Sequence, residues 1–155
     1  MKISNKIMKS LNFKGIILLL LLFTSTYISA QTSDAVLGTW LNDTKEAKIE
    51  IFKNGNKYFG KIIWLKIPND ANGQAKTDTH NSDSKLKLRK ILGLQIIQNF
   101  DYAGGNLWDN GKIYDPKNGK TYSCKMTLID KNNLEVRGFI GISILGRTTT
   151  WTRSN

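Results

Sequence analysis

From residue 37 onward the chain is divided into short runs of alternating or β-branched residues, with almost no helical periodicity. Eight runs bounded by Gly, Asn or Asp are predicted to be strands: 37–41, 46–53, 57–66, 91–100, 106–114, 120–129, 133–140 and 146–153. The reversals FKNGNKY, LIDKNNLEV and YDPKNGKTY are typical of tight hairpins. An eight-stranded meander with one apolar phase closes as a barrel, because closure removes exposed edges. The sequence therefore predicts an all-β fold, an eight-stranded antiparallel up-and-down barrel.

The connections between these strands predict two different barrel ends. Alternate connections of a meander lie at the same end, so the tight reversals at 54–56, 101–105 and 130–133 share one end. The other end receives YDPKNGK, GISILG and the 66–90 loop of 25 residues. Long connections without regular structure are uncommon and are often lids or binding loops. We therefore expect a closed base and an open mouth.

The first 30 residues predict a secretory signal peptide. Residues 1–14 contain four lysines and no acids, residues 15–23 are an unbroken apolar run, and small residues lead to Ala30. The apolar run is about half of the ~20 residues that a membrane-spanning helix needs, and no cysteine follows it for lipid attachment. We expect cleavage near Ala30, a single barrel domain over 31–155, a periplasmic or secreted location, and no transmembrane anchor in the mature form.

The charge and the single cysteine add two expectations. Residues 31–155 carry 19 Lys and Arg against 12 Asp and Glu, so the exported part has a net charge of about +7. Such an excess favours solubility and would also attract anionic lipid, another anionic envelope component or nucleic acid. Cys124 has no partner for a disulfide, and it alternates in phase with Met126 and Leu128. We expect a buried, unreactive thiol.

Two short features at the predicted closed end resemble lipocalins. Gly38-Thr39-Trp40 resembles the lipocalin G-x-W motif, and Arg153 resembles the arginine that stacks on its tryptophan. A guanidinium lying on an indole gains a cation–π contact, and its donors can reach backbone carbonyls. Trp40 and Arg153 are therefore expected to form a structural plug rather than a binding site.

A longer resemblance covers nearly the whole predicted mature chain, residues 31–155. The segments GKIIWLKIP, KLRKILGL, LWDNGKIYDPKNGKTYSCKMTL, LEVRGFIG and LGRTTTWTR resemble, in this order, an exported bacterial family catalogued as domain of unknown function 2147. The resemblance implies a lipocalin-like (calycin) barrel in the periplasm or outside the cell, with no established activity. This chain departs from the family pattern at Ser82, Lys87 and Lys90, all in the long loop.

The tops of the predicted strands supply the candidate ligand-binding residues. An apolar cup with a few polar groups at its rim is the usual form of a small-molecule site. The candidates at the barrel mouth are Trp64, Arg89, Tyr114, Tyr122, Arg137, Phe139 and Arg147, with Asp115 beside them. Two alternatives stay open: Arg137 and Arg147 pair with Asp115 or Glu135 in structural bridges, or the aromatic side chains simply fill the barrel.

The long loop is rich in oxygen ligands but matches no metal motif. It contains Asp70, Asn72, Asp78, His80, Asn81 and Asp83, without the glycine and glutamate that an EF-hand requires. His80 is the sole histidine of the chain, which excludes a multi-histidine zinc site. We expect a solvated loop and no metal. No glycine-rich phosphate loop and no aromatic-basic stripe occurs, so neither a nucleotide cofactor nor nucleic acid is expected.

Three functions are compatible with this sequence. The first is a carrier that holds a small hydrophobic or amphiphilic molecule, such as a lipid or fatty acid, in the barrel. The second is a filled barrel that binds an envelope protein or anionic lipid through its basic surface and the 66–90 loop, with Lys85, Lys87, Arg89 and Lys90 as the candidate contacts. The third and weakest is a hydrolase or isomerase in which Asp78, His80 and Asp83 act together.

Overall fold

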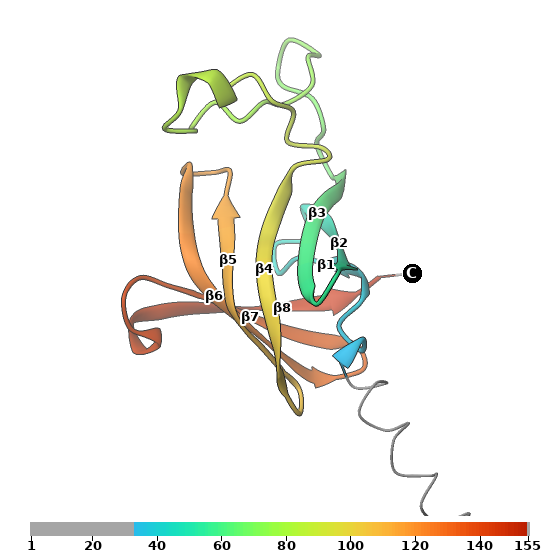
Figure 1. Ribbon diagram of the computed structural model, residues 1–155. Helices are drawn as coiled ribbons and strands as arrows, with labels where there is room; N and C mark the ends of the chain where they lie inside the picture. Colours follow the sequence, from blue (N-terminus) through green and yellow to red (C-terminus); the bar gives the residue numbers. More distant parts are fainter. Residues whose placement is uncertain (1–32, 155) are drawn as a thin grey trace, which may run out of the picture. The chain divides into compact units, whose positions relative to one another are not determined.

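A computed structural model describes residues 33–154, and eight antiparallel strands within them form a closed barrel (Figure 1). The strands are β1 (Gly38–Leu41), β2 (Ala47–Asn54), β3 (Lys57–Leu65), β4 (Gln95–Gly104), β5 (Leu107–Asp115), β6 (Lys120–Asp130), β7 (Asn133–Phe139) and β8 (Gly146–Arg153). Two short 3₁₀ helices, η1 (Ser84–Leu86) and η2 (Ser143–Leu145), lie in the connections. The predicted signal peptide lies outside the described residues. Between residues 33 and 154, no helix is long and apolar enough to cross a membrane.

Each strand pairs with its neighbours in sequence, and β1 closes the barrel against β8 through Trp40 opposite Arg153. The predicted all-β, eight-stranded barrel is confirmed. The fourth strand begins later than predicted, at Gln95 instead of residue 91. Residues 91–94 form a turn, in which the Leu94 amide donates to the Ile91 carbonyl and Gly93 has a positive φ of 89°.

The end of the barrel with the tight hairpins is filled by large side chains. Trp40, Tyr58, Phe100 and Trp108 are all at most 1 % exposed. The Phe100 ring packs against the backbone of Gly111, where an added Cβ would lie 2.0 Å from a ring carbon. A glycine is therefore needed at this point for the ring to cross the interior. This packing closes one end of the barrel.

Cys124 lies inside the barrel wall and is 1 % exposed. Burial, with a smaller contribution from Asp109, raises the pKa of its thiol to about 12. Because the thiolate is the reactive form, we expect the native protein to react with a disulfide reagent at least 100-fold more slowly than the urea-unfolded chain. Absorbance of the released thiol measures both rates. Similar rates would contradict the placement of Cys124.

Candidate functional site

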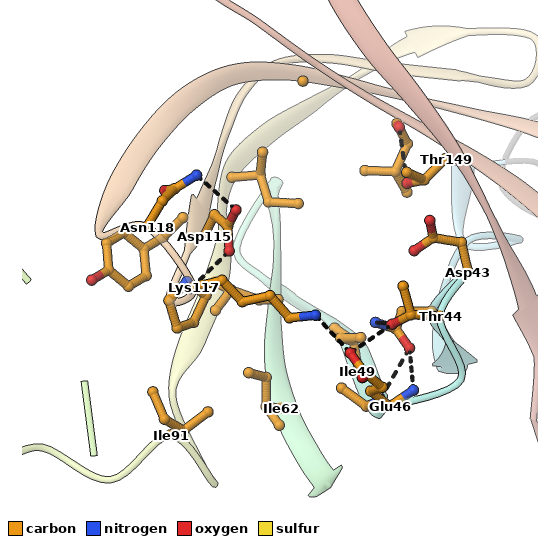
Figure 2. Close-up of a pocket in the computed structure, with 18 of the residues that line it drawn as sticks. Asp43, Thr44, Glu46, Ile49, Ile62, Ile91, Asp115, Lys117, Asn118 and Thr149 are labelled. Carbon is orange, nitrogen blue, oxygen red and sulfur yellow. Dashed lines mark hydrogen bonds and ion pairs between the residues drawn. The ribbon is translucent and has the colours of Figure 1, made fainter. Parts of the chain in front are cut away.

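A cavity of about 1,100 Å³ opens at the barrel end opposite the Trp40–Arg153 pair. Figure 2 shows part of its lining, including Ile49, Ile62 and Thr149. Its inner wall comes from inward-facing positions of six strands and the turn before β4. The wall consists mainly of apolar side chains, with the hydroxyl-bearing Thr149 beside them. The apolar residues include Ile49, Ile62, Leu65, Ile91, Ile96, Ile113, Val136 and Trp151. Period-2 alternation turns most of these side chains toward one another, and an irregularity in β3 brings Leu65 to the same side. The interior is thus apolar at depth and open at the predicted mouth.

The rim of the cavity carries charged side chains of both signs. Lys117 Nζ lies 2.6 Å from a carboxylate oxygen of Glu46, and Arg147 lies 3.9 Å from Asp43. The hydrogen bond from Lys117 holds the pKa of the Glu46 carboxyl below its ordinary value. The Arg147 side chain is 84 % exposed, so its guanidinium is accessible from solvent and from the mouth. An apolar cup with such a rim can accommodate an amphiphilic molecule.

Four of the seven candidate mouth residues line the cavity: Tyr114, Tyr122, Phe139 and Arg147. Trp64, Arg89 and Arg137 are not among the lining residues. Local structure that the sequence did not reveal explains the position of each of these three residues.

Trp64 faces away from the cavity because β3 contains an irregularity near its end. Pairing with β2 shifts register there, so that Ile62 lies opposite Ile49 whereas Trp64 lies opposite Lys48. The extra residue reverses the alternation, and Leu65 takes the inward position that Trp64 would otherwise have. The Trp64 side chain is 41 % exposed, and the Lys48 ammonium lies 5.9 Å from its ring centre.

Arg137 points outward from β7 and binds the connection to β8. Its guanidinium donates to the Ser143 carbonyl from Nε and Nη2, at 2.9 and 2.6 Å, and to Thr148 Oγ1 at 2.7 Å. These partners are a backbone carbonyl and a threonine hydroxyl, whereas one alternative predicted a salt bridge from Arg137 to Asp115 or Glu135. Arg137 instead shapes the β7–β8 connection.

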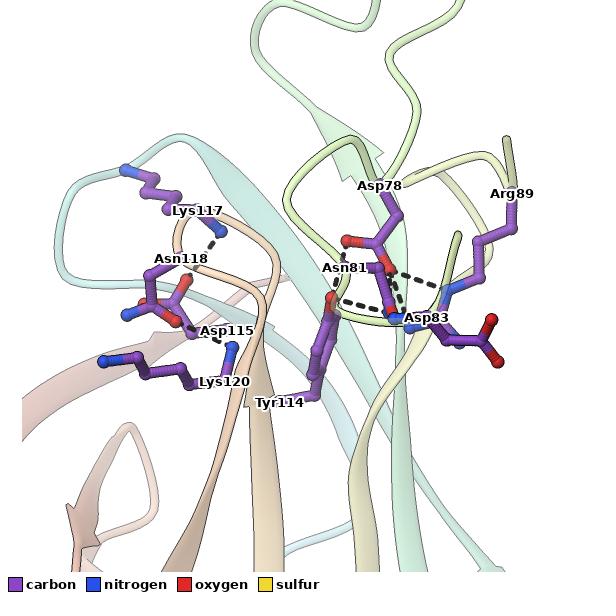
Figure 3. Close-up of polar contacts among 9 residues, drawn as sticks. All are labelled: Asp78, Asn81, Asp83, Arg89, Tyr114, Asp115, Lys117, Asn118 and Lys120. Atoms are coloured by element: carbon purple, nitrogen blue, oxygen red, sulfur yellow. Dashed lines mark hydrogen bonds and ion pairs between the residues drawn. The ribbon is translucent and has the colours of Figure 1, made fainter. Parts of the chain in front are cut away.

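A buried polar network anchors the long loop to the barrel (Figure 3). Asp78 is fully buried, and its carboxylate accepts hydrogen bonds from Tyr114 Oη at 2.6 Å and Asn81 Nδ2 at 2.8 Å. Arg89 donates to the same carboxylate from Nε at 2.8 Å and lies 2.7 Å away through Nη2. The Arg89 guanidinium also lies 5.1 Å from the Tyr114 ring centre. Asp78, Asn81 and Arg89 thus bind the long loop to Tyr114 at the end of β5.

The network sets the charge state of its members. Burial alone would raise the pKa of the Asp78 carboxyl, but hydrogen bonds from Tyr114, Asn81 and Arg89 bring it below its ordinary value. Burial, followed by the hydrogen bond to Asp78, raises the pKa of the Tyr114 hydroxyl. The pair is therefore an ionised carboxylate that accepts from a neutral phenol, and Tyr114 is not activated as a nucleophile.

We expected the polar side chains of the long loop to be solvated. This prediction is wrong for Asp78 and for Asn81. Both side chains are buried, at 0 % and 6 % exposure. The backbone next to them also packs tightly: a Cβ on Gly119, in the β5–β6 turn, would lie 1.9 Å from the His80 carbonyl oxygen. The position of Tyr114 at a strand end could be predicted from the sequence, but the loop residue that it meets could not.

The three residues of the enzyme hypothesis have separate surroundings. His80 lines the cavity, Asp78 is engaged by Tyr114, and Asp83 accepts from the Lys85 amide at the start of η1. Over residues 33–154, no group of three or more His, Cys, Asp or Glu side chains is placed to hold a metal ion.

The opposite end of the barrel carries the Trp40–Arg153 pair. The Arg153 guanidinium lies 4.2 Å from the Trp40 ring centre. It donates to the carbonyls of Ala35, Leu37 and Lys131 at 2.7, 2.8 and 2.6 Å. Trp40 Nε1 donates to the Val36 carbonyl at 2.9 Å. The pair therefore holds the segment before β1 and the end of β8 together at the closed end of the barrel.

The family model described as "Uncharacterized protein conserved in bacteria (DUF2147)" matches residues 38–153, which is the whole barrel. The chain belongs to this family. Protein HP1028 from Helicobacter pylori, described as a lipocalin-family protein, is a solved structure with a similar fold: TM-score 0.66, 24 % identity, 77 % of this chain and 83 % of that chain covered. The family assignment and the lipocalin-like fold are thus both shown. No curated protein is significantly similar in sequence.

Proposed function

We propose that this family member binds a small hydrophobic or amphiphilic molecule, such as a fatty acid, inside the barrel. The observation that carries the proposal is the cavity of about 1,100 Å³, which has an apolar wall and opens at one end. Ligand pockets commonly have volumes of ~300–1,000 Å³, so the space is ample for a drug-sized or single-chain amphiphile. The apolar wall reaches Ile49 and Trp151 inside the barrel, which favours a ligand-binding interior over the alternative of a filled barrel.

The charged side chains at the rim favour an amphiphilic ligand over a purely apolar one. An acyl chain would lie along Ile62, Ile96 and Trp151, and its polar end would remain near the mouth. There Arg147 and Lys117 offer cationic donors, although Asp43 and Glu46 already partner them. A carboxylate would compete for these donors. We also propose a periplasmic or secreted location, on the basis of the predicted signal peptide.

The proposal is tested by filling the cavity with one side chain. Thr149 lines the cavity, whereas its neighbour Thr150 is exposed on the outside of β8. We expect Thr149→Trp to weaken binding of a fluorescent fatty acid at least tenfold, because the indole would occupy ligand space. Thr150→Trp is the matched control and should bind as the wild type does. Fluorescence titration measures both affinities, and thermal melts establish that both variants fold.

Equal binding by the two variants would place the fatty acid outside the cavity. Absence of saturable binding by the wild-type protein, across acyl chains of different length, would contradict the carrier function itself. In either case the cavity would need another explanation.

A further inference from the structure

The β7–β8 connection, residues 140–145, exposes four large aliphatic side chains. Ile140, Ile142, Ile144 and Leu145 are 69, 64, 79 and 73 % exposed. Single exposed aliphatic residues are ordinary, but four within six positions form an apolar tip. This apolar tip, defined as Ile140–Leu145, projects beyond the paired strands (Figure 1).

The backbone of the apolar tip is held by hydrogen bonds within the protein. Arg137 donates to the carbonyls of Ser143 and Ile144, and the Leu145 amide donates to the Ile142 carbonyl at 3.1 Å. These bonds satisfy polar backbone groups within the protein and leave the aliphatic side chains outside. A loop held in this way can place its side chains in an apolar environment without exposing those carbonyls to it.

The apolar tip is continuous with the cavity. Ile140 and Leu145 contribute to the cavity lining, as do Phe139 and Arg147 on either side of them. Ile142 and Ile144 do not line it. An apolar surface thus extends from the interior of the barrel to the exposed end of the tip.

The barrel end that carries the tip is basic. The connections at this end, residues 42–46, 66–94, 115–120 and 140–147, contain ten Lys and Arg against six Asp and Glu. In the long loop, exposed Lys85 and Lys87 alternate with Leu86 and Leu88, the latter 84 % exposed. Cationic and aliphatic side chains together are suited to an anionic lipid surface, since the cations meet headgroups while the aliphatic groups enter the acyl boundary.

We propose that the mouth end of the barrel docks on an anionic lipid bilayer, with the apolar tip inserted and the cationic side chains of the mouth-end connections, Arg147 among them, on the headgroups. A second copy of the chain fits less well, because a stable protein interface uses about 20–30 residues a side and the tip has six. Docking would bring the cavity mouth to the lipid. This proposal goes beyond ligand binding and does not depend on what occupies the cavity.

The test compares vesicle binding by two serine variants. The double variant Ile142→Ser/Ile144→Ser removes the exposed end of the tip and leaves the cavity lining intact. Ile129→Ser is the control, because Ile129 is 53 % exposed on β6 near the closed end. With vesicles of 30 % phosphatidylglycerol in phosphatidylcholine, we expect co-sedimentation to give a partition coefficient at least tenfold lower for the double variant and unchanged for Ile129→Ser. Pure phosphatidylcholine vesicles should bind the wild type at least tenfold more weakly than the anionic ones.

Three results would overturn the proposal. They are a wild type that does not bind anionic vesicles, a double variant that binds like the wild type, and a concentration-dependent self-association in sedimentation velocity that the double variant abolishes. Thermal melts identify a variant that has not folded, and Ile144→Asp then serves as the second substitution. Fatty-acid titration separates this proposal from the cavity: the double variant should keep the wild-type affinity, and Thr149→Trp should keep wild-type vesicle binding.

Discussion

Asp78→Asn is expected to lower the free energy of unfolding by about 3 kcal/mol, because it disrupts a buried network at its centre. The carboxylate is fully buried and accepts from Tyr114, Asn81 and Arg89. An amide in its place presents an N–H group to at least one of these donors and leaves Arg89 without its counter-charge. Urea denaturation of both proteins at pH 7 measures the difference.

The effect of Asp78→Asn should also depend on pH. Since folding lowers the pKa of this carboxyl, its contribution to stability is complete above the unfolded value of about 4 and is lost as the pH falls through the folded value. The stability difference between wild type and variant should therefore be largest from pH 5 upward and should narrow below pH 4.

Asp83→Asn is the matched control for this prediction. Asp83 is exposed and accepts from the Lys85 amide at the start of η1, a role that asparagine fills equally well. Its free energy of unfolding should stay within about 0.5 kcal/mol of the wild type. A loss at Asp78 no larger than that at Asp83 would contradict the buried network.

Arg153→Ala is expected to destabilise the protein by about 3 kcal/mol through the closed end of the barrel. The change removes the cation above Trp40 and three donors to backbone carbonyls, including those of Ala35 and Leu37. Arg153→Lys should recover less than half of the loss, because an ammonium cannot reach three carbonyls while lying flat on the indole. Thermal and urea unfolding followed by tryptophan fluorescence measure both variants.

Arg147→Ala is the control at the other end of the same strand. Its side chain is 84 % exposed and lies 3.9 Å from Asp43, so we expect a change within about 0.5 kcal/mol. Similar losses at Arg153 and Arg147 would show that Arg153 does not hold the barrel floor.

The barrel could be predicted from the sequence because its signals are local. Asn-Gly reversals such as that at residues 54–56 fix hairpins between neighbouring strands, and a run of eight such strands has one simple closure. The end at which the cavity opens also followed from counting strands, since the tight reversals all lie at the other end.

The details of the site could not be predicted, because they depend on contacts distant in sequence or on breaks in the alternation. The β3 irregularity that turns Trp64 outward has no separate sequence sign, because period-2 alternation assumes that no residue is inserted. Asp78 meets Tyr114 across 36 positions, so its burial depends on how the long loop folds. Arg137 was expected to line the mouth, yet it lies outside the cavity lining and binds the backbone of the β7–β8 connection at the same end of the barrel.

Native mass spectrometry of the protein purified under non-denaturing conditions from the cells that make it tests ligand binding in the barrel most directly. The wild type is predicted to retain one small amphiphile per chain, released by organic extraction, and Thr149→Trp purified in the same way is predicted to lack it. A wild type with the mass of the polypeptide alone, or a bound molecule that Thr149→Trp retains in equal amount, would contradict a ligand inside the barrel.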